Sequence, residues 1–259
     1  MLGAIVGDIV GSVYEFHNLT TKEFELFTPR NFFTDDSVLT VATAHALLTD
    51  RDFSRAYRAL VRLYPTRSYG VMFLRWALTD NAGPYRSFGN GAAMRVSPVA
   101  YVSDSLEETL RLARSSAEVT HDHPEGIRGA QAIALAIYLA RKGTTLKTLR
   151  EIVQGAFGYN LKNSVDEIRK VNRYDETCQV TVPVALACVL ESTSFEDALR
   201  NAVSVGGDTD TIAAIAGSIA ETVHGIPEDI VQSALEYLDP DLKKTIGAFK
   251  DTFMTGQNG

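Results

Sequence analysis

The sequence has few cysteines and no segment typical of a secreted or membrane-spanning protein. Its two cysteines, Cys178 and Cys188, would lie roughly 15 Å apart if the chain between them is helical, too far for a disulfide. The apolar segment from Leu2 to Val13 is too short to cross a bilayer, contains Asp8 and lacks the basic residues that begin a secretory signal. We therefore expect free thiols, a reducing cytoplasmic location and no membrane association.

Runs of basic residues are also absent. The 259 residues contain 25 lysines and arginines against 32 aspartates and glutamates, a formal net charge of −7. This balance excludes a protein that binds nucleic acid non-specifically through its phosphate backbone. It does not exclude a phosphate-bearing ligand, because backbone amides or bound cations can hold one.

No proline-rich, serine-rich or charge-rich stretch divides the chain. Hydrophobic residues make up 45% and charged residues 22%, an ordinary balance for a globular protein that buries a core. We predict one domain over residues 1–259 and a monomeric protein.

Apolar residues recur at helical spacing along most of the chain, whereas strand-like alternation is scarce. Ser105 before Glu108 and Thr193 before Glu196 are typical helix caps, and Pro183 is expected as the first residue of a helix. We predict an all-α fold. The expected helices lie near residues 3–14, 35–49, 52–63, 68–79, 106–117, 127–137, 145–157, 182–191, 212–223, 227–237 and 240–250.

Two polar or turn-rich segments, 17–33 and 80–92, interrupt the predicted helices. Loops of this length in a compact domain are often functional or mobile. We expect them to form the walls of a pocket, and segment 17–33 to open and close over it.

Two acid clusters stand at predicted helix starts: Thr34-Asp35-Asp36 and Gly206-Gly207-Asp208-Thr209-Asp210-Thr211. Such residues commonly cap helices. In the second cluster, capping accounts for one acid but not for the whole set. Asp208 and Asp210 can converge only if Asp208 lies in the glycine turn, because residues two apart point about 200° apart within a helix.

Four aspartates and two threonines would suffice for two hard cations such as Mg²⁺ or Mn²⁺, which bind oxygen ligands. The spacing of cysteine and histidine that holds soft metals is absent. The helix dipoles oppose this interpretation, since a cation at a helix start meets their positive ends. From the residues alone, capping and metal binding both remain open.

Further candidates lie outside the two acid clusters. Glycines at positions 3, 7 and 11 form a smooth helix face that permits close packing. The backbone of segment 88–95, Phe88-Gly89-Asn90-Gly91-Ala92-Ala93-Met94-Arg95, can approach a ligand closely or form a plain tight turn. In His121-Asp122-His123, either His121 or Asp122 caps the next helix, or the pair binds a metal as in HD phosphohydrolases, with His45 as a further ligand.

Taken together and in this order, Gly3 to Phe16, Thr34-Asp35-Asp36-Ser37, segment 89–95, His121 and residues 206–211 resemble the ADP-ribosylglycohydrolase family, which includes dinitrogenase reductase-activating glycohydrolases. The motifs span about residues 3–225. Ser37 departs from the threonine frequent at this position but keeps the hydroxyl.

The resemblance implies a compact all-α bundle of orthogonal helices with a binuclear Mg²⁺ or Mn²⁺ centre. The implied reaction is hydrolysis of the bond between C1″ of ADP-ribose and an acceptor. By the same resemblance Glu15, Asp36 and Asp208 carry the acid–base chemistry. The implied metal ligands are Thr34, Asp35, Asp36, Asp208, Asp210 and Thr211, and the implied substrate contacts are Phe88, Gly89, Asn90, Gly91, Met94, His121 and Gly126.

Two other functions remain as alternatives: a non-catalytic ADP-ribose-binding protein and an HD-type metal phosphohydrolase. The acceptor released from ADP-ribose is not identified by any motif. The ADP-ribosylated substrate is the expected partner.

Overall fold

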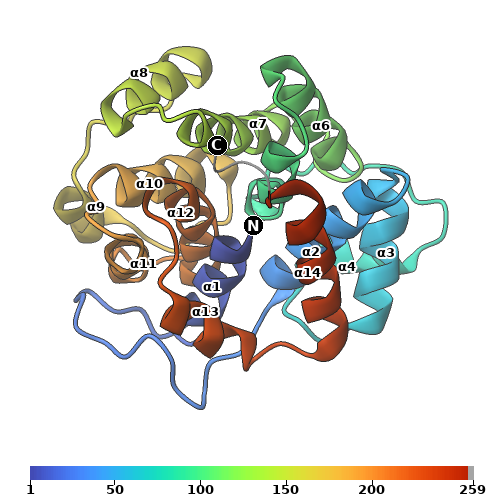
Figure 1. The fold of residues 1–259 in the computed structure, drawn as a ribbon, viewed down its shortest axis with the longest axis horizontal. Coiled ribbons are helices and arrows are strands. Elements are labelled where there is room, and N and C mark those ends of the chain that lie inside the picture. Colours follow the sequence, from blue (N-terminus) through green and yellow to red (C-terminus); the bar gives the residue numbers. More distant parts are fainter. Residues whose placement is uncertain (256–259) are drawn as a thin grey trace.

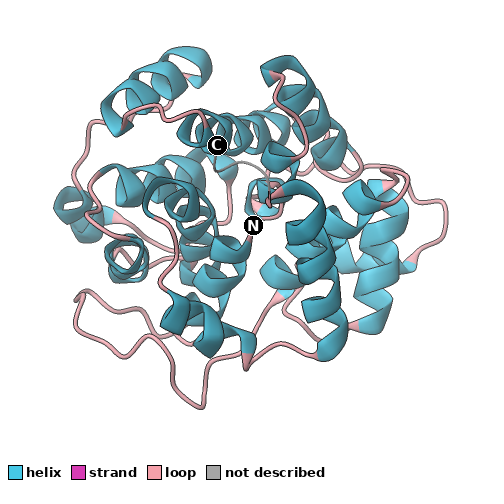
Figure 2. Cartoon of the chain, in the orientation of Figure 1, coloured by secondary structure: helices cyan, strands magenta, loops and turns pink. Residues whose placement is uncertain are grey.

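The computed structural model describes residues 1–255, which form fourteen α-helices, one 3-10 helix and no β-strand (Figure 2). The all-α prediction is thus confirmed. In chain order the elements are α1 Leu2–Gly11, α2 Asp35–Leu48, α3 Phe53–Leu63, α4 Val71–Leu78, α5 Gly91–Met94, η1 Ser97–Tyr101, α6 Leu106–Glu118, α7 Pro124–Arg141, α8 Leu146–Phe157, α9 Val165–Val171, α10 Cys178–Leu190, α11 Phe195–Ser204, α12 Thr209–His224, α13 Glu228–Leu235 and α14 Pro240–Phe253.

Helices α1 and α12 form the centre of the fold (Figure 1). Residues 3–11 of α1 and residues 209–220 of α12 are all buried, so neighbouring helices surround both. The glycine face of α1 packs directly on the α12 backbone: a Cβ atom added to Gly7 would lie 2.0 Å from the Ala213 carbonyl oxygen, and one on Gly3 would lie 2.1 Å from that of Gly217. The predicted close packing of this face is confirmed.

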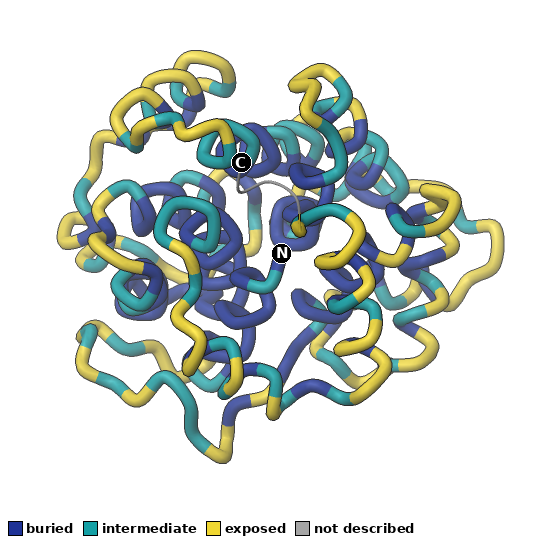
Figure 3. Tube along the Cα trace, in the orientation of Figure 1, coloured by how far each residue is buried: buried dark blue, intermediate teal, exposed yellow. Residues whose placement is uncertain are grey.

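The remaining helices enclose this pair. Helices α10 and α11 pack on α12, while α2 contacts α1 and is covered by α14. Figure 3 shows the central helices buried and the connections on the outside more exposed. Because α1 lies between α2 and α12, the starts of α2 and α12 come together near the end of α1. Among the described residues, no helix combines the length and apolarity needed to cross a membrane.

Several local predictions were wrong. Helix α10 begins at Cys178, so Pro183 lies inside it; the hydrogen bond it lacks falls on the carbonyl of Gln179, an exposed residue that water can reach. Ser194, not Thr193, caps α11 by accepting a bond from the Asp197 amide. The short elements α5, η1 and α9 were not predicted, because one or two turns are too short to show a helical period.

Candidate active site

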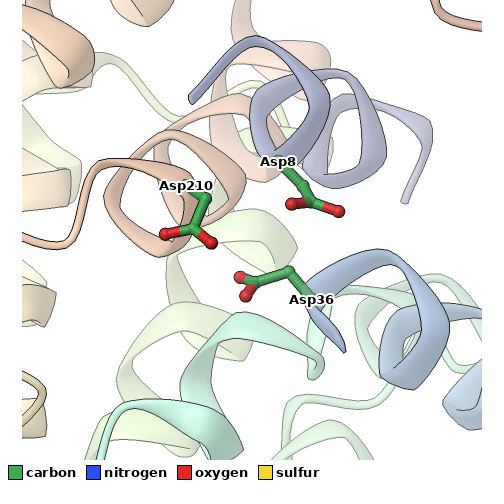
Figure 4. Close-up of side chains that lie close together, drawn as sticks. All are labelled: Asp8, Asp36 and Asp210. Atoms are coloured by element: carbon green, nitrogen blue, oxygen red, sulfur yellow. The ribbon is translucent and has the colours of Figure 1, made fainter. Parts of the chain in front are cut away.

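Three aspartates from three helices meet at the centre of the molecule (Figure 4). Asp8 comes from α1, Asp36 from the first turn of α2 and Asp210 from the first turn of α12. Each offers a carboxylate oxygen within 4.8 Å of the others, and all three side chains are buried. Such a concentration of buried acids is unfavourable without compensating positive charge.

Asp8 is the member of this group that was not predicted. Its carboxylate accepts bonds from the Thr34 amide (2.9 Å), the Thr34 hydroxyl (2.7 Å), the Ser37 amide (3.1 Å) and the Ser37 hydroxyl. Asp8 therefore fixes the start of α2 against α1. Only one of these donors reaches Oδ1, so this oxygen retains a lone pair for a cation.

Thr34 is the helix cap in the first cluster, since its hydroxyl accepts a bond from the Asp36 amide at 3.2 Å. The capping alternative therefore applies to Thr34 and leaves the Asp36 carboxylate available. Asp35 is partly buried and lines the cleft described below. Thr211, from α12, donates its hydroxyl to Asp36 Oδ2 at 3.2 Å and so links the two clusters.

A second acid group adjoins the first and shares Asp210 with it: Glu15, Asp208 and Asp210 also offer oxygens within 4.8 Å of one another. Asp208 lies outside α12, in a non-helical conformation, and makes no side-chain cap bond. Gly206 and Gly207 precede it with φ angles of 67° and 83°, a region that favours glycine. Asp208 therefore lies in the glycine turn, the condition that the sequence predicted for its carboxylate to converge with that of Asp210.

Asparagine side chains hold the parts of this second group in place. The Asn18 side chain accepts a bond from the Gly207 amide at 2.7 Å and donates to the carbonyls of Glu15 (2.9 Å) and Gly207 (3.1 Å). It therefore joins the Glu15 segment to the glycine turn. From the other side of the site, Asn90 Nδ2 donates to Asp208 Oδ2 at 2.6 Å.

The electrostatics of the two groups fit a bound cation. Burial is the main factor that raises the pKa of Asp8, Asp36 and Asp210. Repulsion from neighbouring carboxylates adds to it for Asp36 and Asp210, whereas hydrogen bonds from Ser37 and Thr34 oppose it for Asp8. Burial likewise raises the pKa of Asp208 to about 6. Asp36 Oδ1 is buried and has no hydrogen-bond partner among residues 1–255. A buried oxygen without a donor, surrounded by other carboxylates, suits a hard divalent cation.

A cleft of about 640 Å³ opens onto the acids. Of the predicted substrate contacts, Gly89, Asn90, Gly91, Met94 and His121 line it, as do Asp35, Asp36, Asp208, Asp210 and Thr211.

Two predicted substrate contacts are not among the residues that line the cleft. Phe88 is 46% exposed and its ring packs at 5.4 Å from that of His123. Gly126 lies behind the cleft wall, where a Cβ atom would meet the Ser87 carbonyl oxygen at 2.8 Å and His121 Cβ at 2.9 Å. A direct role in binding stays a prediction for both residues.

Glu15 lies at the mouth of the cleft, just beyond the end of α1. Burial, followed by repulsion from Asp210, raises its pKa to about 7. The Tyr174 hydroxyl lies 3.1 Å from Glu15 Oε1 and 2.7 Å from Glu176 Oε1, so its single proton reaches one carboxylate at a time. Tyr174 and Glu176, on the segment before α10, were not predicted, because neither belongs to a recognisable motif.

Comparison with known proteins identifies the family. The sequence profile described as ADP-ribosylglycohydrolase matches residues 1–257. The chain belongs to this family. Human ADP-ribosylhydrolase ARH3 is 27% identical over 93% of this chain and 90% of its own length. ADP-ribosylarginine hydrolase Tri1 of Pseudomonas putida (strain GB-1) is 26% identical over 87% and 70%.

A solved structure supports the same fold. The chain described as an ADP-ribosylglycohydrolase-related protein complex superposes with a TM-score of 0.70 at 23% identity, covering 96% of each chain. The all-α bundle is therefore the fold of the ADP-ribosylglycohydrolase family.

Family membership and the placement of the histidines leave the HD-phosphohydrolase alternative without support. His123 caps α7 by accepting a bond from the Glu125 amide, so neither His121 nor Asp122 is the cap. Asp122 instead accepts from the Arg86 amide at 2.6 Å, and His45 is exposed on α2. Within residues 1–255, the groups able to hold a metal contain no histidine.

Proposed function

We propose that this family member is a metal-dependent hydrolase that cleaves the glycosidic bond between C1″ of ADP-ribose and an acceptor. The observation that carries the proposal is the buried Asp36 Oδ1, unpartnered among the described residues, in the first of two acid groups that share Asp210. The two adjacent groups support a pair of divalent cations, Mg²⁺ or Mn²⁺. The partner is an ADP-ribosylated substrate.

The proposed ligands come from both groups and from the residues between them. When bound, the cations would supply positive charge that orients the distal ribose and offsets negative charge developing on the departing acceptor. Asp8 joins the proposed set because its Oδ1 keeps a lone pair. The other proposed ligands are Thr34, Asp35, Asp36, Asp208, Asp210 and Thr211.

The acid–base work is proposed for Glu15, Asp36 and Asp208. With a pKa of about 7, the Glu15 carboxyl can hold or release a proton near neutral pH. Asn90 orients Asp208 through its 2.6 Å hydrogen bond. Gly89 and Gly91, which lack side chains, let a ligand approach the backbone of the opposite wall.

The experiment that tests this function measures ADP-ribose release from a panel of ADP-ribosylated acceptors, with Mg²⁺, with Mn²⁺ and with chelator. We expect release that requires metal. Equal rates with chelator would refute metal dependence. Tight ADP-ribose binding with no release from any acceptor would favour the non-catalytic alternative.

Replacing Glu15 tests its chemical role within that assay. Because Gln keeps the shape but cannot exchange a proton, we expect Glu15→Gln to lower turnover by at least about 100-fold while ADP-ribose binding persists. Glu23→Gln, at an exposed position of the same loop, is the matched control. Full turnover by Glu15→Gln would remove Glu15 from the chemistry.

We further propose that residues 1–259 act as one domain, as a monomer in the cytoplasm. The thiols of Cys178 and Cys188 are buried and unpaired, which suits a reducing compartment. A single cooperative unfolding transition and a monomer mass in light scattering are the expected results.

A further inference from the structure

Arg95 is a buried cation without a matching anion. It follows α5, is 0% exposed, and forms no ion pair with any described residue; its Nε and Nη1 atoms have no hydrogen-bond partner. Its guanidinium lies over the Tyr57 ring, 4.2 Å from the centroid. Burying an unpaired charge is unfavourable unless other contacts compensate for it.

The Thr120 hydroxyl links Arg95 to His121. Arg95 Nη2 lies 2.8 Å from Thr120 Oγ1 and 3.3 Å from the Ser116 carbonyl oxygen. Thr120 Oγ1 in turn lies 2.7 Å from His121 Nδ1. Because a guanidinium only donates, the Thr120 hydroxyl must accept from Arg95.

This arrangement favours one tautomer of the imidazole, because the other would leave the proton of the buried Thr120 hydroxyl without an acceptor. The Thr120 hydroxyl has one proton, and within residues 1–255 the remaining partner able to accept it is His121 Nδ1. A neutral imidazole that accepts at Nδ1 carries its own proton on Nε2. Burial and, secondarily, the charge of Arg95 hold the pKa of His121 well below its usual value, so the ring stays neutral at physiological pH.

The Nε2 atom faces the cleft wall formed by the glycine-rich segment. A Cβ atom on Gly91 would lie 3.2 Å from it and one on Gly89 would lie 3.7 Å away. The absence of both side chains leaves the N–H group reachable from the cleft, which His121 lines. Tyr85 packs on the ring at 6.1 Å between centroids, and the Asp122 carboxylate is bound to the Arg86 amide.

We propose that Arg95 and Thr120 are positioning residues that hold His121 as a neutral Nε2–H donor directed into the cleft, where it serves an anionic oxygen of the ligand. A phosphate oxygen only accepts hydrogen bonds, so it requires a donor at this point. That this oxygen belongs to ADP-ribose rests on the proposed function. The position of the imidazole proton does not depend on the proposed function.

The tautomer is tested by ¹⁵N NMR of the histidine side chains in the ligand-free protein, with His121→Gln used to assign the signals. We expect His121 in the wild type to show a protonated Nε2 and an unprotonated Nδ1 across neutral pH. Thr120→Val, which keeps the shape but removes the hydroxyl, should give a mixture of tautomers. Thr120→Ser should restore the wild-type spectrum. A protonated Nδ1 in the wild type, or an unchanged spectrum in Thr120→Val, would overturn the proposal.

Ligand binding gives the second readout, on variants whose circular dichroism matches the wild type. Thr120→Val should weaken ADP-ribose binding in calorimetry about tenfold, the loss of roughly one hydrogen bond, and raise KM with little change in kcat. Thr120→Ser should bind within about twofold of wild type. If Thr120→Val binds ADP-ribose as tightly as the wild type, the tautomer serves no ligand, and the proposed contact between His121 and the ligand is overturned. If the wild type has the expected tautomer but binds no ADP-ribose, the proposed function fails while the assignment of the proton stands.

Discussion

At the scale of single residues, the two aspartates at the centre of the site differ in what surrounds them. Asp8 accepts bonds from four donors on Thr34 and Ser37, whereas Asp36 Oδ1 has none. Asp8 thus both faces the candidate cation site and holds α2 in position. Asp36 is better suited to bind an ion than to stabilise the fold.

This difference predicts opposite effects on the stability of the metal-free protein. Asp8→Asn should lower the free energy of unfolding by about 2 kcal/mol, because an amide nitrogen would face the donors of α2. Asp36→Asn should leave it unchanged or raise it, since a buried, repelled carboxylate is removed. Both variants should bind Mg²⁺ at least about tenfold more weakly. Urea unfolding and calorimetry measure these effects; equal destabilisation by the two would contradict the distinction.

At the scale of elements, the site depends on how closely α1 and α12 approach. Glycines on one face of α1 meet the carbonyl groups of α12 directly, and this contact brings Asp8 beside Asp210. The acid groups are therefore assembled by backbone packing as much as by the acids themselves.

Gly7→Ala tests this dependence. Its Cβ would lie 2.0 Å from the Ala213 carbonyl oxygen, so the helices must separate; we expect a loss of about 3 kcal/mol in unfolding free energy and weaker metal binding. Gly155→Ala, in α8 with open space around it, should instead gain about 0.5 to 1 kcal/mol, because alanine restricts the unfolded chain and favours helix. A Gly7→Ala variant as stable as wild type would show that the contact is dispensable.

At the scale of the whole molecule, the clustered acids link stability to pH. Glu15 and Asp208 have pKa values raised to about 7 and about 6, mainly by burial. In the unfolded chain such groups titrate near pH 4. Between these limits the folded, metal-free protein binds more protons than the unfolded chain, so the contribution of these groups to stability falls as pH rises.

We therefore expect the unfolding free energy of the metal-free protein, relative to the Mg²⁺-saturated protein, to decline from about pH 4.5 to about pH 7. Cations favour the ionised carboxylates, so the gap between the two forms should widen with pH. Urea unfolding at several pH values, with Mg²⁺ and with chelator, measures this gap. In Glu15→Gln, this gap should change less with pH at the upper end of the range. A gap that is constant or narrows as pH rises would contradict the expectation.

The sequence predicted most of the long helices because their apolar period is set by local geometry and survives in any packing. It missed the beginning of α10, where Pro183 looked like a first residue, and the short elements α5, η1 and α9. It also missed Asp8, although one acid within the otherwise apolar α1 was a visible signal.

The sequence by itself determined the helical class, the two acid clusters, the glycine face of α1 and, through the order of its motifs, the resemblance to the family. Only the tertiary structure decided that Asp210 belongs to both acid groups, that Asp8 completes one of them, and that Thr34 caps α2 while Asp36 does not. The reason is physical: periodicity and capping depend on neighbours along the chain, whereas an electrostatic site depends on distances between side chains that hundreds of residues can separate.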